Sequence, residues 1–132
     1  MRKSKINISG FKIGTAENRD GLTGVTVILA PDGGATAGVD VRGCAPGTRE
    51  TDLLDPRKTV QKIHAVVLSG GSAFGLEAAS GCVKYLAEQG VGFPIGNVCV
   101  PIVCSAVLFD LMIGDEKAYP DLLMGYEAAK SA

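Results

Sequence analysis

The stretch HAVVLSGGSAFGLEAASG, residues 64–81, decides the fold because a strand pattern, a glycine turn and a helix pattern follow one another directly. The apolar residues 64–69 predict a buried strand. Helical spacing predicts a helix over 73–89, from Leu76, Ala79, Val83 and Leu86. Gly90 provides a natural C-terminal stop for this helix. The order strand, turn and helix indicates an α/β protein.

The turn Gly70, Gly71 and Ser72 resembles two functional motifs without matching either. A nucleophile elbow needs Gly-x-Ser-x-Gly, and Phe74 takes the last glycine's place. A dinucleotide loop needs Gly-x-Gly-x-x-Gly, and Ser72 takes the middle glycine's place. We therefore expect Ser72 to be the N-cap of the helix. The alternative is that backbone N–H groups of this turn bind a substrate carbonyl or carboxylate.

A serine nucleophile requires a base, and the single histidine of the chain is badly placed for that role. His64 begins the strand, so about 15 Å or more would separate it from Ser72. We expect a partly buried histidine at the strand end, and no Ser-His-Asp triad. Asp110 and Asp115 are typical of turn formation, with paired acid and base carboxylates as the alternative.

Two β-branched runs, 24–30 and 35–42, flank the turn sequence PDGG and predict a β-hairpin. In the second run one face carries the apolar residues Ala37, Val39 and Val41, so only that face is expected to meet a core. A long loop over 43–62 follows, in which Arg49 and Glu50 are expected to form an ion pair; contact with substrate is the alternative.

The C-terminal third has two further elements. Residues 98–111 are apolar on both faces, which predicts a bent strand or a strand pair covered on two sides and broken at Pro101. A last helix is predicted from about Asp121, and it reaches Ala132 with neither glycine nor proline to end it. This ending predicts a chain cut within a larger domain.

Composition limits the classes of protein. The 132 residues carry 13 basic and 14 acidic side chains without runs of one sign, so neither nucleic acid nor a membrane surface is an expected partner. The basic start lacks a secretory apolar core, and no apolar run approaches the roughly 20 residues of a membrane span, which predicts a cytoplasmic protein. Four cysteines without zinc-site spacing predict buried free thiols, and no metal or cofactor is expected.

Three blocks carry a resemblance to a known family. They are residues 23–56 with RGCAPGTRETDLL, residues 64–79 with LSGGSAFGL, and residues 101–111 with PIVCSAVLFDL. Over about residues 10–129 the chain resembles the N-terminal part of the P1 peptidases, formerly S58 or T4. This group contains the L-aminopeptidase/D-amidase and the nylon-oligomer hydrolases.

The resemblance implies an N-terminal-nucleophile-like αββα sandwich, related in fold to the ornithine acetyltransferases. Such enzymes cleave themselves to free a Ser or Thr whose α-amino group, titrating near pH 8, acts as general base. The family's nucleophile, lysine and asparagine lie downstream of the matched segment. Residues 1–132 are therefore expected to be a single N-terminal fragment, an incomplete sandwich that is inactive alone. The expected partners are the C-terminal part of the same protein, further copies in a homo-oligomer, and a small amide or peptide substrate.

No catalytic residue is assigned to this chain, and its expected role is a substrate-pocket wall. The assigned substrate-binding residues are Gly70, Gly71, Ser72, Phe74 and Phe109. Val107 and Phe109 replace a glutamate and a tyrosine of the aminopeptidase branch, which favours the other hydrolases of the group. The alternatives are a non-catalytic assembly module from a truncated paralogue, and acyl transfer as in the ornithine acetyltransferases.

Overall fold

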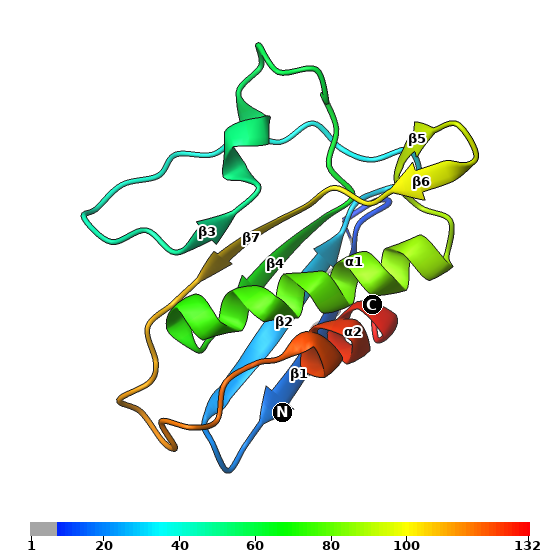
Figure 1. The fold of residues 1–132 in the computed structure, drawn as a ribbon. Helices are drawn as coiled ribbons and strands as arrows, with labels where there is room; N and C mark the ends of the chain where they lie inside the picture. Colours follow the sequence, from blue (N-terminus) through cyan, green and yellow to red (C-terminus); the bar gives the residue numbers. More distant parts are fainter. Residues whose placement is uncertain (1–7) are drawn as a thin grey trace.

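A computed structural model describes residues 8–132 as one mixed sheet with two helices packed on the same face (Figure 1). The prediction that the chain lacks a secretory apolar core concerns its opening segment, which lies outside these residues. The sheet order is β1-β2-β4-β7-β3, with strands β1 Lys12–Asn18, β2 Thr23–Leu29, β3 Thr48–Arg49, β4 Ala65–Ser69 and β7 Val103–Val107. Only β4 and β7 are parallel neighbours; every other pair in this sheet is antiparallel.

The predicted hairpin of 24–30 with 35–42 is wrong. β2 pairs with β1 on one edge and with β4 on the other, so both of its edges are occupied. The turn itself forms, with the Gly34 amide donating to the Pro31 carbonyl at 2.9 Å, but it leads into a loop. In this loop Ala35 alone is bridged, to Ile63, and Val39 is 49% exposed, so no core-facing strand exists there.

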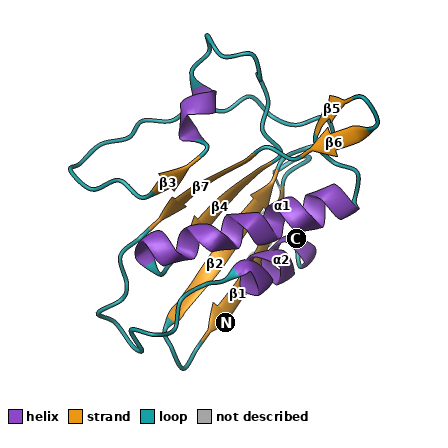
Figure 2. Cartoon of the chain, in the orientation of Figure 1, coloured by secondary structure: helices purple, strands orange, loops and turns teal. Residues whose placement is uncertain are grey.

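The predicted central helix is confirmed, with a tighter first part. A 3-10 helix, η2 Ser72–Glu77, continues directly into α1 Ala78–Glu88 (Figure 2). Gly90 ends it with a left-handed φ of 68°, as expected of a C-terminal glycine. The last helix is also confirmed as α2 Leu122–Lys130, whose N-cap Asp121 accepts a hydrogen bond from the Met124 amide at 2.8 Å.

The core lies between the sheet and the two helices. Alternate strand residues point into it and meet small helix residues, the innermost being Val25, Val27, Ala65, Val67, Ala78, Ala79, Cys82, Ala128 and Ala129. The two helices approach closely at Gly125, where an added Cβ would lie 1.9 Å from the Ala78 carbonyl oxygen. On the opposite sheet face Ile13 and Leu68 are 44% and 46% exposed. One face of the sheet is therefore covered by helices, and the other is open.

Residues 98–111 are only partly as predicted. The break at Pro101 is confirmed, since it separates β6 Val98–Val100 from β7. β7 is largely buried, whereas β6 forms an exposed hairpin with β5 Phe93–Ile95 and is covered on neither side. This hairpin stands beside the sheet rather than within it, and its sequence alone does not reveal that placement.

The cysteines are free, as predicted, but two of them are not buried. Cys82 and Cys104 are buried, and burial raises the pKa of the Cys82 thiol to about 12. Cys44 and Cys99 are exposed because their segments are the loop after β2 and the outlying hairpin. No helix within residues 8–132 has the length and apolar character required to cross a bilayer.

Candidate functional site

The Gly-Gly-Ser turn lies where the parallel strands β4 and β7 both end. The Leu108 amide donates to the Ser69 carbonyl, and the Ser72 amide donates to the Leu108 carbonyl, each at 3.0 Å. The segment after β7 is thereby joined to the turn after β4. Carboxyl edges of parallel strands are the usual place for ligand sites in α/β proteins.

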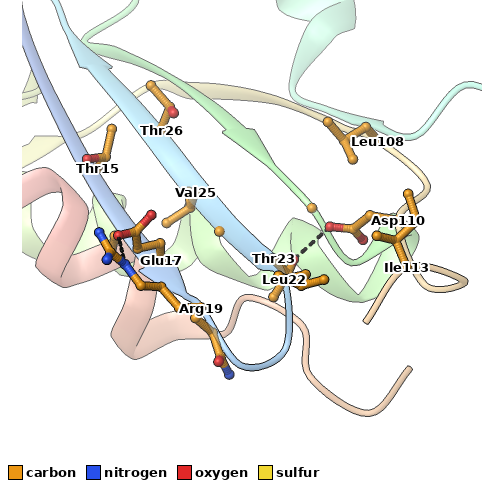
Figure 3. Close-up of a pocket in the computed structure, with 14 residues that line it drawn as sticks. Thr15, Glu17, Arg19, Leu22, Thr23, Val25, Thr26, Leu108, Asp110 and Ile113 are labelled. Carbon is orange, nitrogen blue, oxygen red and sulfur yellow. Dashed lines mark hydrogen bonds and ion pairs between the residues drawn. The ribbon is translucent and has the colours of Figure 1, made fainter. Parts of the chain in front are cut away.

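Asp110 holds this turn in place. One carboxylate oxygen accepts a hydrogen bond from the Gly71 amide at 2.6 Å. The other accepts from Thr23 Oγ1 at 2.7 Å (Figure 3). Thr23 is only 9% exposed, so its hydroxyl depends on this partner. The predicted role of Asp110 in turn formation is confirmed, although its turn is a distant one. Asp115 instead accepts from the Lys117 amide at 2.9 Å, so the two aspartates serve separate turns.

The backbone donors of the turn already have partners. The Gly70 amide donates to the Gly24 carbonyl at 2.9 Å, the Gly71 amide to Asp110, and the Ser72 amide to Leu108. The hypothesis that these three N–H groups bind a substrate carbonyl or carboxylate does not fit this arrangement. The Asp110 carboxylate occupies the place that a bound anion would take at Gly71.

Ser72 is not the N-cap of the helix, contrary to expectation. Gly71 takes that position with φ of 80°, and no side chain caps the helix start. A side-chain cap needs an extended backbone, whereas Ser72 is left-handed with φ of 52°. Non-glycine residues in this conformation cost about 1–3 kcal/mol and concentrate at functional sites. Gly70 and Gly71 are buried and Ser72 is half-buried, and the assignment of these three residues to substrate binding stays a prediction.

The two predicted wall aromatics stand in different surroundings. The Phe74 ring stacks on Tyr119, with centroids 4.6 Å apart and planes at 16°. Phe109 is 64% exposed and forms no aromatic pair within residues 8–132. Tyr119 is a residue that sequence reasoning missed, because 45 positions separate it from Phe74. The role of both phenylalanines in substrate binding stays a prediction.

A groove runs from this turn onto the open face of the sheet (Figure 3). Its walls include three strongly exposed apolar side chains, Leu22, Leu108 and Ile113. Thr15 and Thr26, opposite each other in the β1–β2 register, also line it. The rim carries the exposed ion pair of Arg19 and Glu17, at 2.7 Å. Apolar walls with a few polar groups are typical of small-molecule sites.

His64 lies at the strand end, as predicted, but it is buried rather than partly buried. It is 6% exposed, and its Nδ1 accepts a hydrogen bond from the Ile102 amide at 3.1 Å. Burial lowers the pKa of this imidazole below its ordinary value. It precedes β4, whose opposite end carries Ser72, so it does not act as a base for that hydroxyl.

The expected ion pair of Arg49 with Glu50 is wrong. The Arg49 guanidinium donates to Ser80 Oγ at 2.7 Å and thereby links β3 to α1. Glu50 has a left-handed backbone with φ of 61°, and its carbonyl accepts from Cys104 Sγ at 3.4 Å. Glu50 lies just after β3, where the chain turns into the 3-10 helix η1 Thr51–Leu54. Among residues 8–132, no three His, Cys, Asp or Glu side chains gather to hold a metal ion.

These features define a mixed α/β protein with a one-sided helix layer and a clamped glycine turn at the carboxyl edge of its sheet. The chain belongs to peptidase family S58, whose model matches residues 5–132. The resemblance inferred from the three sequence blocks is therefore confirmed.

Several known proteins are similar to this chain in sequence. A protein named as an uncharacterized aminopeptidase from Mycobacterium leprae is 45% identical over 134 residues, covering 96% of this chain and 37% of the relative. Another so named, from Mycobacterium tuberculosis strain H37Rv, is 50% identical over 109 residues, covering 83% of this chain and 31% of the relative. A 6-aminohexanoate-oligomer endohydrolase from Paenarthrobacter ureafaciens is 34% identical over 128 residues, covering 97% of this chain and 33% of the relative. The chain thus spans about a third of the length of these relatives.

Proposed function

We propose that this chain is the N-terminal portion of a self-processing amide or peptide hydrolase. It supplies scaffold and one wall of the substrate pocket, while the attacking Ser or Thr belongs to polypeptide beyond these residues. Membership of a peptidase family supports the reaction class. The chain matches only about a third of each relative, which supports placing the nucleophile in polypeptide outside these residues.

The observation that carries the proposal is the open face of the sheet. Both helices pack on one face, whereas Ile13, Leu68 and the groove walls remain exposed on the other. A sheet with one solvated apolar face is stabilised by a second layer. We infer that the remaining polypeptide adds a second sheet and helix layer there, which completes an αββα sandwich.

The proposed chemistry requires no base from this chain. In the described residues the only imidazole lies at the far end of β4 from Ser72, and its Nδ1 is occupied by the Ile102 amide. A freed α-amino group next to the nucleophile accepts the hydroxyl proton in its place. Ser72, Phe74 and Phe109 then form the pocket wall on the side of the clamped turn.

The wall favours aliphatic amide substrates. Val107 and Phe109 offer no carboxylate or hydroxyl to hold a substrate amine. Hydrocarbon side chains bind a methylene chain by burying apolar surface. We therefore place oligoamides ahead of short peptides as substrates.

Four free thiols fit a cytoplasmic, reducing location. The exposed β5–β6 hairpin suits contacts in a homo-oligomer.

The test is complementation. The chain would be produced alone, and also together with the part of the Mycobacterium leprae relative that lies outside the matched region. Hydrolysis of 6-aminohexanoate oligomers and of amino-acid amides is then measured. We expect turnover only for the combination, and Ser72→Ala to reduce this turnover without abolishing it. Turnover by the chain alone that disappears in Ser72→Ala would instead make Ser72 the nucleophile.

A second function, assembly without chemistry, is favoured by the same open face. An exposed apolar sheet face associates with another subunit whether or not catalysis follows. Formation of a stable complex with no turnover on any amide would support this candidate over the hydrolase.

A further inference from the structure

A second cavity, of about 390 Å³, lies at the end of the sheet away from the Gly-Gly-Ser turn. Leu29, at the end of β2, and Leu86, near the end of α1, are both buried and provide its apolar floor. Tyr85 flanks the floor, and the exposed side chains Lys12 and Asp32 stand at the rim. This volume is within the range of small-ligand pockets, about 300–1,000 Å³.

The rim carries one positive and one negative group. Lys12 is opposite Leu29 in the β1–β2 register, so its side chain leaves the same face of the sheet as the leucine floor. Asp32 belongs to the turn in which the Gly34 amide donates to the Pro31 carbonyl. Neither Lys12 nor Asp32 forms an ion pair within residues 8–132. Two opposite charges therefore border the same cavity.

His64 adds a directed donor. Because its Nδ1 accepts the Ile102 amide hydrogen, the ring proton is carried by Nε2 in the neutral form. This Nε2–H donates to no group of the described chain. Within the described residues, the one fully buried side-chain oxygen or nitrogen without a hydrogen-bond partner is Ser105 Oγ, so the His64 Nε2 atom is not fully closed off from solvent. His64 is one of the residues that line the cavity, and its Cδ2 lies beside Gly34 of the Pro31–Gly34 turn. A side chain more than nine-tenths buried thus keeps an unused donor at this cavity.

We propose that this cavity binds a free amino acid with an apolar side chain. The ligand carboxylate accepts from His64 Nε2–H and pairs with the Lys12 ammonium. The ligand ammonium pairs with the Asp32 carboxylate, and the apolar side chain lies on Leu29 and Leu86. Binding here is independent of hydrolysis, because the cavity and the proposed pocket wall lie at opposite ends of the sheet.

The ligand class is tested on the full chain with three probes: L-leucine, 4-methylpentanoate, which lacks the amine, and isopentylamine, which lacks the carboxylate. The chain contains one histidine, so the imidazole carbon-bound proton signals in an NMR titration report His64 alone. We expect these signals to shift saturably with leucine at pH 7.5, and each truncated probe to bind at least threefold more weakly. No saturable shift below 10 mM leucine (roughly the weak limit of a specific site), or equal binding of 4-methylpentanoate, would overturn the proposal.

Variants test the residue assignment. Lys12→Met and Asp32→Asn are each expected to weaken leucine binding about two- to fivefold, as loss of one exposed ion pair does. The matched controls Lys117→Met and Asp20→Asn make the same charge changes away from the cavity and are expected to leave binding unchanged. Equal affinities for the cavity variants and the controls would refute the site. Hydrolase activity in the complementation experiment is scored separately, so either proposal can fail without the other.

Discussion

The amide nitrogen of Gly71 lies 2.6 Å from a carboxylate oxygen of Asp110, a residue 39 positions later in the chain. The second carboxylate oxygen is held by Thr23, at the start of β2. Three segments therefore meet at one carboxylate: the start of β2, the turn after β4 and the loop after β7. The shape of the proposed pocket wall depends on this clamp.

Asp110→Ala is expected to lower the free energy of unfolding by about 3 kcal/mol. The change removes two hydrogen bonds to a charged group and leaves the Thr23 hydroxyl and the Gly71 amide without a partner. Asp110→Asn keeps an acceptor and is expected to lose less. Urea unfolding measures both values. Asp115→Ala is the control, with an expected loss below about 0.5 kcal/mol, and an equal loss for the two alanine variants would contradict the clamp.

Gly70→Ala is expected to prevent stable folding or to displace the turn. An added Cβ would lie 2.1 Å from the Asp110 carboxylate and 2.4 Å from Thr23 Oγ1, and neither partner can move without breaking their mutual hydrogen bond. Gly38→Ala serves as the matched control, because its Cβ would meet nothing within 4 Å. Circular dichroism and thermal unfolding should show a large loss at position 70 and almost none at position 38. Comparable melting temperatures for the two variants would show that the close packing at Gly70 is not required.

Arg49→Ala is expected to lower the free energy of unfolding by about 1.5 kcal/mol, as loss of a hydrogen bond from a charged group does. Arg49 is half-buried, and its bond to Ser80 joins the edge strand β3 to α1. Arg42→Ala removes an equivalent charge from an ion pair with Asp40, whose side chains are 85% and 68% exposed, and should change stability by less than about 0.5 kcal/mol. Hydrogen exchange at the amide of Val107, which donates to the Gly47 carbonyl just before β3, should rise in the first variant only.

His64 is expected to make the protein less stable in mild acid. Burial lowers its pKa in the folded state, whereas the unfolded chain keeps a value of about 6.5. The unfolded state therefore binds more protons below about pH 6.5, so stability falls as pH decreases through this window and is fully present above it. Protonation would also remove the Nδ1 acceptor of the Ile102 amide.

The measurement is an NMR titration of the single imidazole, combined with urea midpoints between pH 5 and pH 7.5. The imidazole midpoint should lie below 6.5, and His64→Asn should flatten the stability profile within this window. A midpoint above 6.5 would contradict the buried, neutral histidine described by the structure.

The correct sequence predictions all depend on residues that are close together along the chain. The strand before Gly70 was predicted from residues 64–69, and the helix after it from residues 73–89, so each pattern lies within one short stretch of sequence. The helix from Asp121 begins with a cap whose partner, Met124, is three residues away. The Gly90 stop likewise follows from a local backbone preference. Such elements form wherever the surrounding fold allows them.

The wrong predictions concern pairing. Residues 35–42 have a strand-like composition and follow a turn, but β1 and β4 occupy both edges of β2. β1 was not predicted, since only alternate residues of KIGTAEN face the helices, and two of these are glycine and alanine. The Ser72 cap failed for a similar reason. Contacts of the turn with Leu108 and Asp110 impose a left-handed backbone that the local sequence does not specify.

By itself, the sequence determined the α/β class, the central strand, turn and helix, the last helix and membership of the peptidase family. These properties depend on periodicity and motifs that neighbouring residues carry together. Only the tertiary structure decided which strands pair, that both helices cover one face, and that Asp110 and Thr23 clamp the glycine turn. The physical reason is distance along the chain: Thr23 and Asp110 are 87 residues apart, and their contact exists only once the sheet has placed β2, β4 and β7 side by side.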